Sequence, residues 1–108
     1  MLAKFEAVNK RDASGNPAGG DVNGTGLMIV WQNGPLGTAE DGTRIEPNGA
    51  FVETVIAAAK QRIEHYQDSK FACRENAIAI TKLEEALMWL NKRTADREAR
   101  KVEGTHAV

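Results

Sequence analysis

The feature that most constrains the fold is an abrupt change in glycine and proline content near residue 49. Nine of the ten glycines and all three prolines lie at or before Gly49, and only Gly104 lies beyond it. Glycine and proline favour turns and interrupt helices, whereas a long stretch without them permits helices. The sequence therefore predicts a single domain over residues 1–108, with a β-rich part at 1–47 and a helical part at 48–108.

The first part has the pattern of short strands joined by turns. Residues 4–10 can extend as a strand, and the following segment, 14–20, is dense in turn-forming residues. Together they predict a β-hairpin. The polar segment 38–47 predicts either a second, looser hairpin or a surface loop.

A second strand is predicted over residues 27–32, which are rich in side chains that fit a pleated surface. Alternation places Leu27, Ile29 and Trp31 on one face. Met28 and Val30 fall on the other face, so both faces are apolar. We therefore expect both faces of this strand to be covered.

The second part predicts two helices. Asn48 is placed to cap the start of the first helix. An apolar stripe then follows at helical spacing: Val52, Val55, Ile56, Ala59, Ile63 and Tyr66. A break at residues 68–70 predicts a turn. The second helix carries a near-heptad seam: Asn76, Ile80, Leu83, Leu87, Leu90, Thr94, Arg97 and Lys101.

The predicted class is thus α+β, with a small N-terminal antiparallel sheet followed by two long helices that form an antiparallel hairpin. The net charge of -1 offers no overall attraction for nucleic-acid polymers or anionic membranes. The longest apolar run, residues 27–31, is far shorter than the roughly 20 residues of a membrane-spanning helix. A single cysteine, Cys73, and no signal-peptide pattern favour a cytoplasmic protein.

No combination of residues predicts catalysis. Cys73 with His65 or His106 is the one conceivable nucleophile and base pair, and no nucleophile signature surrounds the cysteine. The same residues lack any recognised metal-ligand spacing. The glycines at 34–37 lack the lysine and helix of a phosphate loop. We expect no catalytic set, no metal and no cofactor.

Local charge is concentrated near the C-terminal end of the second helix, where residues 92–101 carry five basic and two acidic side chains. Arg93 and Arg97 are one helical turn apart, so their guanidinium groups share a face that suits a pyrophosphate or two phosphates. The alternative is a solvated helix end with intrahelical pairs, Arg93 with Asp96 and Arg97 with Glu98 or Asp96. Composition leaves both interpretations open.

Two further residues have alternative interpretations. Tyr66 ends the apolar stripe, where it either closes the core or offers a ring on which a base stacks. Asn76 either caps a turn or reads the polar edge of a nucleoside.

Several blocks of sequence form a longer pattern: VNKRD at 8–12, WQNGPLG at 31–37, PNGAFVE at 47–53, FACREN at 71–76, TKLEEAL at 81–87, and residues 93–106. In this order they resemble the phage Thoeris anti-defence sponge family. The second-helix part also resembles the hairpin domain shared with the phage anti-CBASS sponge. The resemblance implies a protein that sequesters a cyclic ADP-ribose isomer, made by a bacterial TIR-domain enzyme, without cleaving it.

The resemblance also implies roles for individual residues. Tyr66 resembles the family's aromatic that stacks on adenine, and Asn76 resembles its polar reader of the nucleoside. Arg93 and Arg97 resemble its phosphate-binding pair. Arg44 corresponds to a loop arginine that closes over the ligand.

Assembly and a second ligand are implied as well. Members of the family form dimers or hexamers through their helices, with the signal bound between subunits. Some also hold cyclic oligonucleotides of the CBASS type in separate pockets, to which Arg74 corresponds, although a carboxylate at Glu75 would repel phosphates. The alternatives are a sponge mainly for CBASS cyclic di- or trinucleotides, a nucleotide-signal hydrolase, or a helical adaptor that binds protein.

Overall fold

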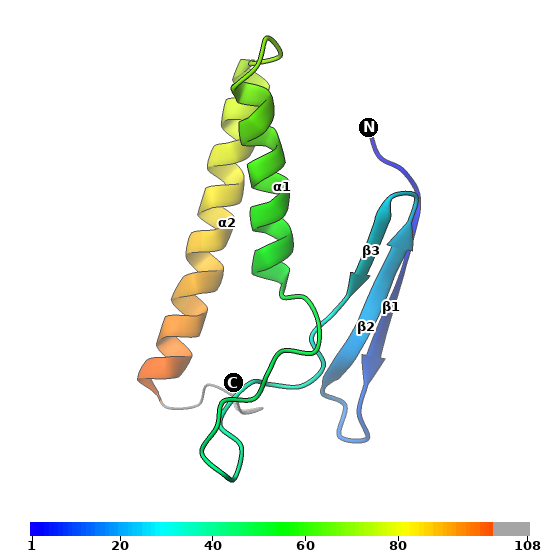
Figure 1. Cartoon of the computed structure of the whole chain (residues 1–108), viewed down its shortest axis with the longest axis vertical. Helices are drawn as coiled ribbons and strands as arrows, with labels where there is room; N and C mark the ends of the chain where they lie inside the picture. Colours follow the sequence, from blue (N-terminus) through cyan, green and yellow to red (C-terminus); the bar gives the residue numbers. More distant parts are fainter. Residues whose placement is uncertain (101–108) are drawn as a thin grey trace. The chain divides into compact units, whose positions relative to one another are not determined.

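The computed structural model describes residues 1–100 and contains a sheet and a pair of helices (Figure 1). The elements are β1 (Phe5–Arg11), β2 (Pro17–Gly24), β3 (Leu27–Val30), α1 (Val52–Gln67) and α2 (Arg74–Ala99). This order confirms the α+β class and the prediction of a small sheet followed by two helices. Predictions that involve Lys101, Gly104 or His106 lie outside the described residues.

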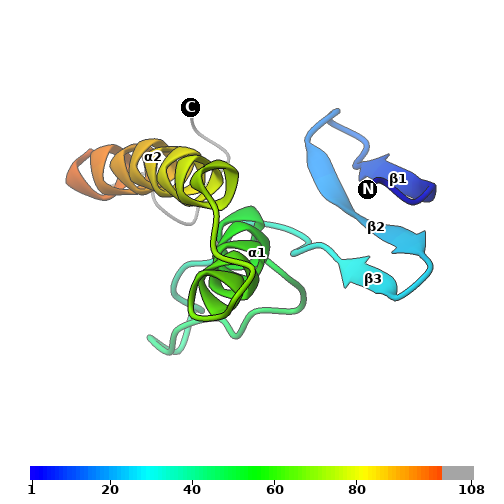
Figure 2. The same cartoon turned by 90° about the horizontal axis from the view of Figure 1, so that it is seen from above.

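The chain divides into two compact units, one containing Met1–Phe51 and the other Val52–Ala99. In the first unit, the strands form an antiparallel sheet in the order β1-β2-β3, and Figure 2 shows them side by side. The β1–β2 turn is closed by the Asp12 carboxylate. Its Oδ1 accepts hydrogen bonds from the backbone N–H of Ser14 at 2.9 Å and of Asn16 at 3.0 Å.

The predicted turn at 14–20 is too long, because β2 already begins at Pro17. Gly19 and Gly20 are strand residues. Gly20 has φ +143°, and a Cβ atom added there would lie 2.0 Å from the carbonyl oxygen of Val8 on β1. This glycine therefore allows the close approach of two strands rather than a tight turn.

The expectation that both faces of β3 are covered is wrong for this chain. Ile29 lies opposite Val22, the buried residue of the sheet, whereas Met28 lies opposite Asn23 and Val30 lies opposite Asp21. Polar partners thus line the second face. Met28 is 78% exposed and Val30 is 56% exposed on it.

Asn48 does not cap the first helix, which begins only at Val52. Its side-chain oxygen accepts from the backbone N–H of Asn33 at 2.7 Å, and its amide donates to the Asn33 carbonyl at 3.0 Å. The backbone N–H of Asn48 also donates to the side chain of Gln32 at 2.8 Å. Ala50 then pairs with Trp31 in an isolated parallel bridge, so the chain here is held beside the end of β3 and does not begin a helix.

In the second unit, α1 and α2 run side by side in opposite directions (Figure 1, green and yellow to orange). The turn predicted at 68–70 lies within the connection between Gln67 and Arg74. The predicted seam of α2 is half-buried at Asn76, Ile80, Leu83, Leu87, Leu90 and Arg97, and its Thr94 is exposed. Neither helix contains a fully buried residue. Within residues 1–100, neither helix has the length and apolar character needed to cross a membrane.

Candidate functional site

The connection between the helices, which we call the turn end (residues 66–76), is held by a set of local hydrogen bonds. The side chain of Gln67 spans it: its amide donates to the Cys73 carbonyl at 3.0 Å, and its oxygen accepts from the Cys73 N–H at 2.9 Å. The hydroxyl of Ser69 donates to the Tyr66 carbonyl and accepts from the N–H of Phe71 at 3.1 Å. These bonds fix the backbone on both sides of the turn.

Tyr66 lies in the last turn of α1 with its side chain 40% exposed. The guanidinium carbon of Arg62, one helical turn earlier, is 4.9 Å from the centre of the tyrosine ring. Arg62 Nε also donates a hydrogen bond to the Tyr66 hydroxyl at 3.2 Å. The ring is therefore accessible and held in one orientation, as a stacking surface requires.

Asn76 lies half-buried in the first turn of α2, at the same end of the hairpin as Tyr66. Its side-chain amide donates to the Phe71 carbonyl at 3.4 Å. The prediction that Asn76 supports a turn is thereby confirmed. Because this bond uses one amide hydrogen, the second hydrogen and the side-chain oxygen have no partner among residues 1–100, and a ligand can use them.

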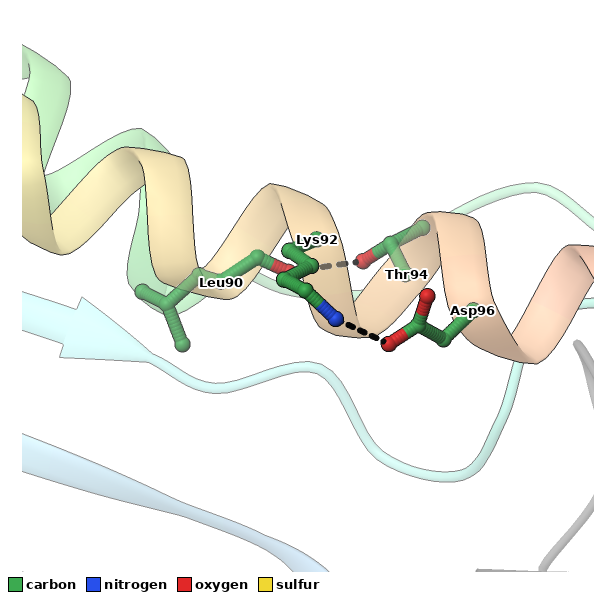
Figure 3. A network of polar contacts seen from close by, with 4 residues as sticks. All are labelled: Leu90, Lys92, Thr94 and Asp96. Carbon is green, nitrogen blue, oxygen red and sulfur yellow. Dashed lines mark hydrogen bonds and ion pairs between the residues drawn. The ribbon is translucent and has the colours of Figure 1, made fainter.

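The opposite end of α2, which we call the open end (residues 90–99), carries Lys92, Arg93 and Arg97. Lys92 Nζ lies 2.9 Å from Asp96 Oδ2, and the Thr94 hydroxyl donates to the Leu90 carbonyl at 3.3 Å (Figure 3). The intrahelical pair expected between Arg93 and Asp96 is wrong, because Lys92 occupies that carboxylate.

Arg93 and Arg97, four residues apart, lie on the same side of α2, with Arg93 exposed and Arg97 half-buried. Two planar forks in neighbouring turns are the groups that bind phosphate oxygens in bidentate fashion. Within one chain these arginines are far from the turn end. Asn76 and Arg93 are separated by nearly five turns of one helix, about 25 Å at a rise of 1.5 Å per residue.

The remaining predicted residues lie elsewhere. Arg44 belongs to the first unit, where Thr38 and Arg44 pair as the bridge of a loose hairpin. This confirms the hairpin interpretation of residues 38–47. Arg74 begins α2 at the turn end and is exposed, with the carboxylate of Glu75 next to it in the first turn.

The loop that carries Arg44 is stabilised by Asp41. Its carboxylate accepts hydrogen bonds from the Thr43 hydroxyl at 2.6 Å and from the Thr43 N–H at 3.0 Å. The bond from the hydroxyl, and then that from the backbone, lower the pKa of Asp41 from its ordinary value. The carboxylate is therefore ionised near neutral pH and orders the residues just before Arg44.

The sequence interpretation missed two residues whose side chains bond to the turn end. Arg62 is at i−4 from Tyr66, the spacing at which side chains meet on a helix, and this spacing was the available signal. Gln67 gave no comparable signal, because its partner is the backbone of Cys73 across a turn. The described residues include no group of three or more His, Cys, Asp or Glu side chains that could hold a metal ion.

Comparison with known protein families matches residues 25–95 to the Acb2/Tad1 hairpin domain. A curated relative, "Thoeris anti-defense 1" of Bacillus phage SBSphiJ7, is 54% identical over 86 residues, which cover 80% of this chain and 56% of the relative. The chain thus spans little more than half the length of that relative. The family match includes Arg44, Tyr66, Asn76 and Arg93 and ends just before Arg97.

Proposed function

Since the chain belongs to the Acb2/Tad1 family, we propose that it is a phage anti-defence protein that sequesters a signalling nucleotide in the cytoplasm of the infected bacterium. The proposed ligand is a cyclic ADP-ribose isomer, glycocyclic ADP-ribose, made by a TIR-domain enzyme of the Thoeris system. Binding without cleavage withholds the signal from its effector. The relative's name, "Thoeris anti-defense 1", supports the defence system, and the residues of the hairpin support the ligand class.

The chemistry of this ligand matches the groups on the helices. An adenine needs a stacking surface and a polar reader, for which the chain offers the exposed ring of Tyr66 and the amide of Asn76. A pyrophosphate needs charge-assisted donors, for which it offers the paired guanidinium groups of Arg93 and Arg97. Sequestration requires no general acid or base.

The observation that carries the proposal is the separation of these two sets of groups. The turn end and the open end lie about 25 Å apart on one α2, which is too far for one compact cyclic nucleotide to contact both. Two copies with their hairpins arranged head to tail place the turn end of one beside the open end of the other. We therefore propose a homo-oligomer, a dimer or a hexamer, with the ligand between subunits.

The surface of α2 supports this assembly. Ile78, Met88 and Trp89 are 40%, 69% and 71% exposed, so apolar area remains on the helix after it has packed on α1. Exposed apolar surface of this kind marks a protein interface. A subunit interface also encloses the ligand and excludes water, which strengthens the guanidinium contacts.

The first experiment is calorimetric titration of the protein with glycocyclic ADP-ribose isomers, followed by heat denaturation of the complex and chromatography of the released nucleotide. Tight binding and release of intact ligand are expected. A converted product would contradict sequestration and indicate a hydrolase. Binding of cyclic di- or trinucleotides alone would indicate a sponge for CBASS signals instead. Arg74 is the candidate residue for that alternative.

A second experiment tests the composite site. Tyr66→Ala chains, expected to bind more weakly, and Arg93→Ala/Arg97→Ala chains, expected to lose capture, are co-expressed with different tags and purified through both. Capture is assayed at a ligand concentration too low for the Tyr66→Ala chain alone to bind. In a hybrid dimer, one site combines both defects and the other combines none, so capture returns at about half of the wild-type stoichiometry. Hybrids that capture no ligand would contradict a site shared between chains.

A further inference from the structure

Arg62 makes two simultaneous contacts with Tyr66 that the proposed ligand roles do not use. Its guanidinium carbon lies 4.9 Å from the ring centre, and its Nε donates to the ring hydroxyl at 3.2 Å. The distance to the ring centre lies within the range of a cation–π interaction. The Arg62 side chain thus lies over one face of the Tyr66 ring and also hydrogen-bonds to the hydroxyl of that ring.

We propose that Arg62 is a positioning residue of the nucleotide site: it covers one face of Tyr66 and presents the opposite face to the purine of the ligand. This inference rests on the proposed function, since it takes Tyr66 as the stacking residue. In the proposed complex, the Tyr66 ring therefore lies between the guanidinium of Arg62 and the purine of the ligand. No general base or metal is involved.

The physical advantage is preorganisation of an exposed side chain. Tyr66 is 40% exposed, so without a neighbour its ring samples several rotamers, and binding a base requires that this freedom be lost. Arg62 removes much of that freedom before the ligand arrives. It also brings a positive charge close to a ligand that carries two phosphates.

Arginine is suited to this position in a way that lysine is not. The planar guanidinium both stacks on an aromatic face and directs a fixed N–H group to an acceptor. A lysine ammonium can lie over the ring but lacks the planar group that makes both contacts. The hydroxyl of Tyr66 is the second half of the arrangement, because a phenylalanine would offer Arg62 no acceptor.

His65, the aromatic neighbour of Tyr66, is not stacked on the tyrosine ring. The centroid of the His65 ring is 6.2 Å from that of Tyr66, with the ring planes at 53°, so His65 is tilted beside the tyrosine rather than stacked on it. Among residues 1–100, Arg62 is the cation found over this ring. Tyr66 is 40% exposed, and in the proposed complex the purine lies on the face opposite Arg62.

The chain contains a matched control. Lys70 Nζ lies 5.3 Å from the ring centre of Phe71, so it is also a cation over an aromatic ring at the turn end. Lys70→Ala removes the same charge as Arg62→Ala but leaves Tyr66 and its partner unchanged. The two variants separate loss of charge from loss of the positioning contact.

Titration of wild type, Arg62→Ala, Arg62→Lys and Lys70→Ala with a glycocyclic ADP-ribose isomer measures the effect. Arg62→Ala is expected to raise Kd about two- to fivefold, the range that corresponds to an exposed cation–π contact. Arg62→Lys is expected to recover part of the loss, and Lys70→Ala to bind as wild type does. An unchanged or lower Kd for Arg62→Ala would overturn the inference.

The same substitutions in a Tyr66→Ala background show how Arg62 acts. If it acts through the ring, Arg62→Ala has no further effect there. A full additional loss would mean that Arg62 contacts the ligand directly, and would overturn the positioning role. A Tyr66→Ala chain with weak but measurable binding is needed, so this titration uses high ligand concentrations.

Tyr66 is the single tyrosine of the chain, so ¹³C-tyrosine labelling gives one set of ring signals that reports on this contact. Arg62→Ala is expected to shift these signals in the free protein, and Lys70→Ala to leave them unchanged. Absence of any shift would contradict the contact itself. If wild type binds no isomer while the tyrosine signals still respond to Arg62→Ala, the proposed function fails and the contact stands.

Discussion

The two ends of the helical hairpin differ in how they are held. At the turn end, Gln67 and Ser69 bond the backbone across the connection, and Tyr66 is held by Arg62. At the open end, the ion pair of Lys92 and Asp96 and the hydrogen bond from Thr94 to Leu90 each join two residues of α2. One end is ordered by its own chain, whereas the other presents charge from one helical face.

This difference indicates a division of labour in the proposed site. A stacking surface and a nucleoside reader require precise orientation, which local hydrogen bonds supply within one subunit. A pair of arginine forks acts through charge and requires less packing around it. The following predictions test this contrast, from the largest expected effect to the smallest.

The largest effect is expected at the open end. Arg93→Ala or Arg97→Ala each removes a charge-assisted fork, and each is expected to abolish capture, with a loss of about 3 kcal/mol or more in binding free energy. Helix content measured by circular dichroism and assembly measured by sedimentation are expected to remain as in wild type. Lys92→Ala is the control for the loss of one positive charge at the same end of α2, because Lys92 has no proposed role in ligand binding. Unchanged capture in both arginine variants would reject the phosphate role.

A smaller effect is expected at the turn end from the loss of the stacking ring. Tyr66→Ala is expected to weaken ligand binding by roughly 1–3 kcal/mol, the usual contribution of one base–aromatic stack. Tyr66→Phe, which keeps the ring, is expected to retain most of this energy. An unaltered dissociation constant for Tyr66→Ala, measured by calorimetry, would remove the base-stacking role.

Gln67→Ala tests whether the turn end is ordered by its own hydrogen bonds. The variant loses both bonds to the Cys73 backbone, and the free energy of unfolding is expected to fall by about 1–2 kcal/mol. Chemical denaturation measures this change. Gln61→Ala, at an exposed position within α1, is the control and is expected to unfold as wild type does. Equal stabilities of the two variants would show that the turn does not depend on Gln67.

The smallest effect concerns the loop that carries Arg44. Because the pKa of Asp41 is lowered in the folded protein, its contribution to loop order is complete above the unfolded-state pKa and is lost as the pH falls through the lower folded value. Thr43→Val removes the hydroxyl that is the main cause, so the pKa of Asp41 is expected to rise. Titration of the Asp41 carboxyl carbon by NMR measures the change. A pKa that is equal in both proteins would contradict the assigned cause.

The helical half was well predicted from sequence because its signals are local and periodic. Six of the predicted seam positions of α2, from Asn76 to Arg97, are half-buried, and the break at 68–70 marks the connection. Arg93 and Arg97 share a face for the same reason of helical spacing. Their function as a phosphate pair stays a prediction, as do the roles of Tyr66, Asn76, Arg44 and Arg74.

The sheet was predicted less accurately because its details depend on contacts between distant residues. From local sequence, Gly20 is predicted to be a turn residue. The structure shows that it is required because the carbonyl of Val8 on the neighbouring strand approaches it closely. From local sequence, Asn48 is predicted to be a helix cap. In the structure, its side-chain oxygen and amide both bond to the backbone of Asn33. In each case a long-range partner overrides a correct local preference, and no window of sequence contains that partner.

Among residues 1–100, only one apolar residue is buried: Val22, which is 8% exposed. In the proposed oligomer, a subunit with so small an interior of its own would draw much of its stability from association with other copies, and association obeys mass action. A ligand that binds only the assembled protein acts on the same equilibrium and stabilises it by an amount that grows with ligand concentration. If the chain captures the proposed signal, accumulation of that signal in the infected cell is expected to make the protein harder to unfold and to degrade.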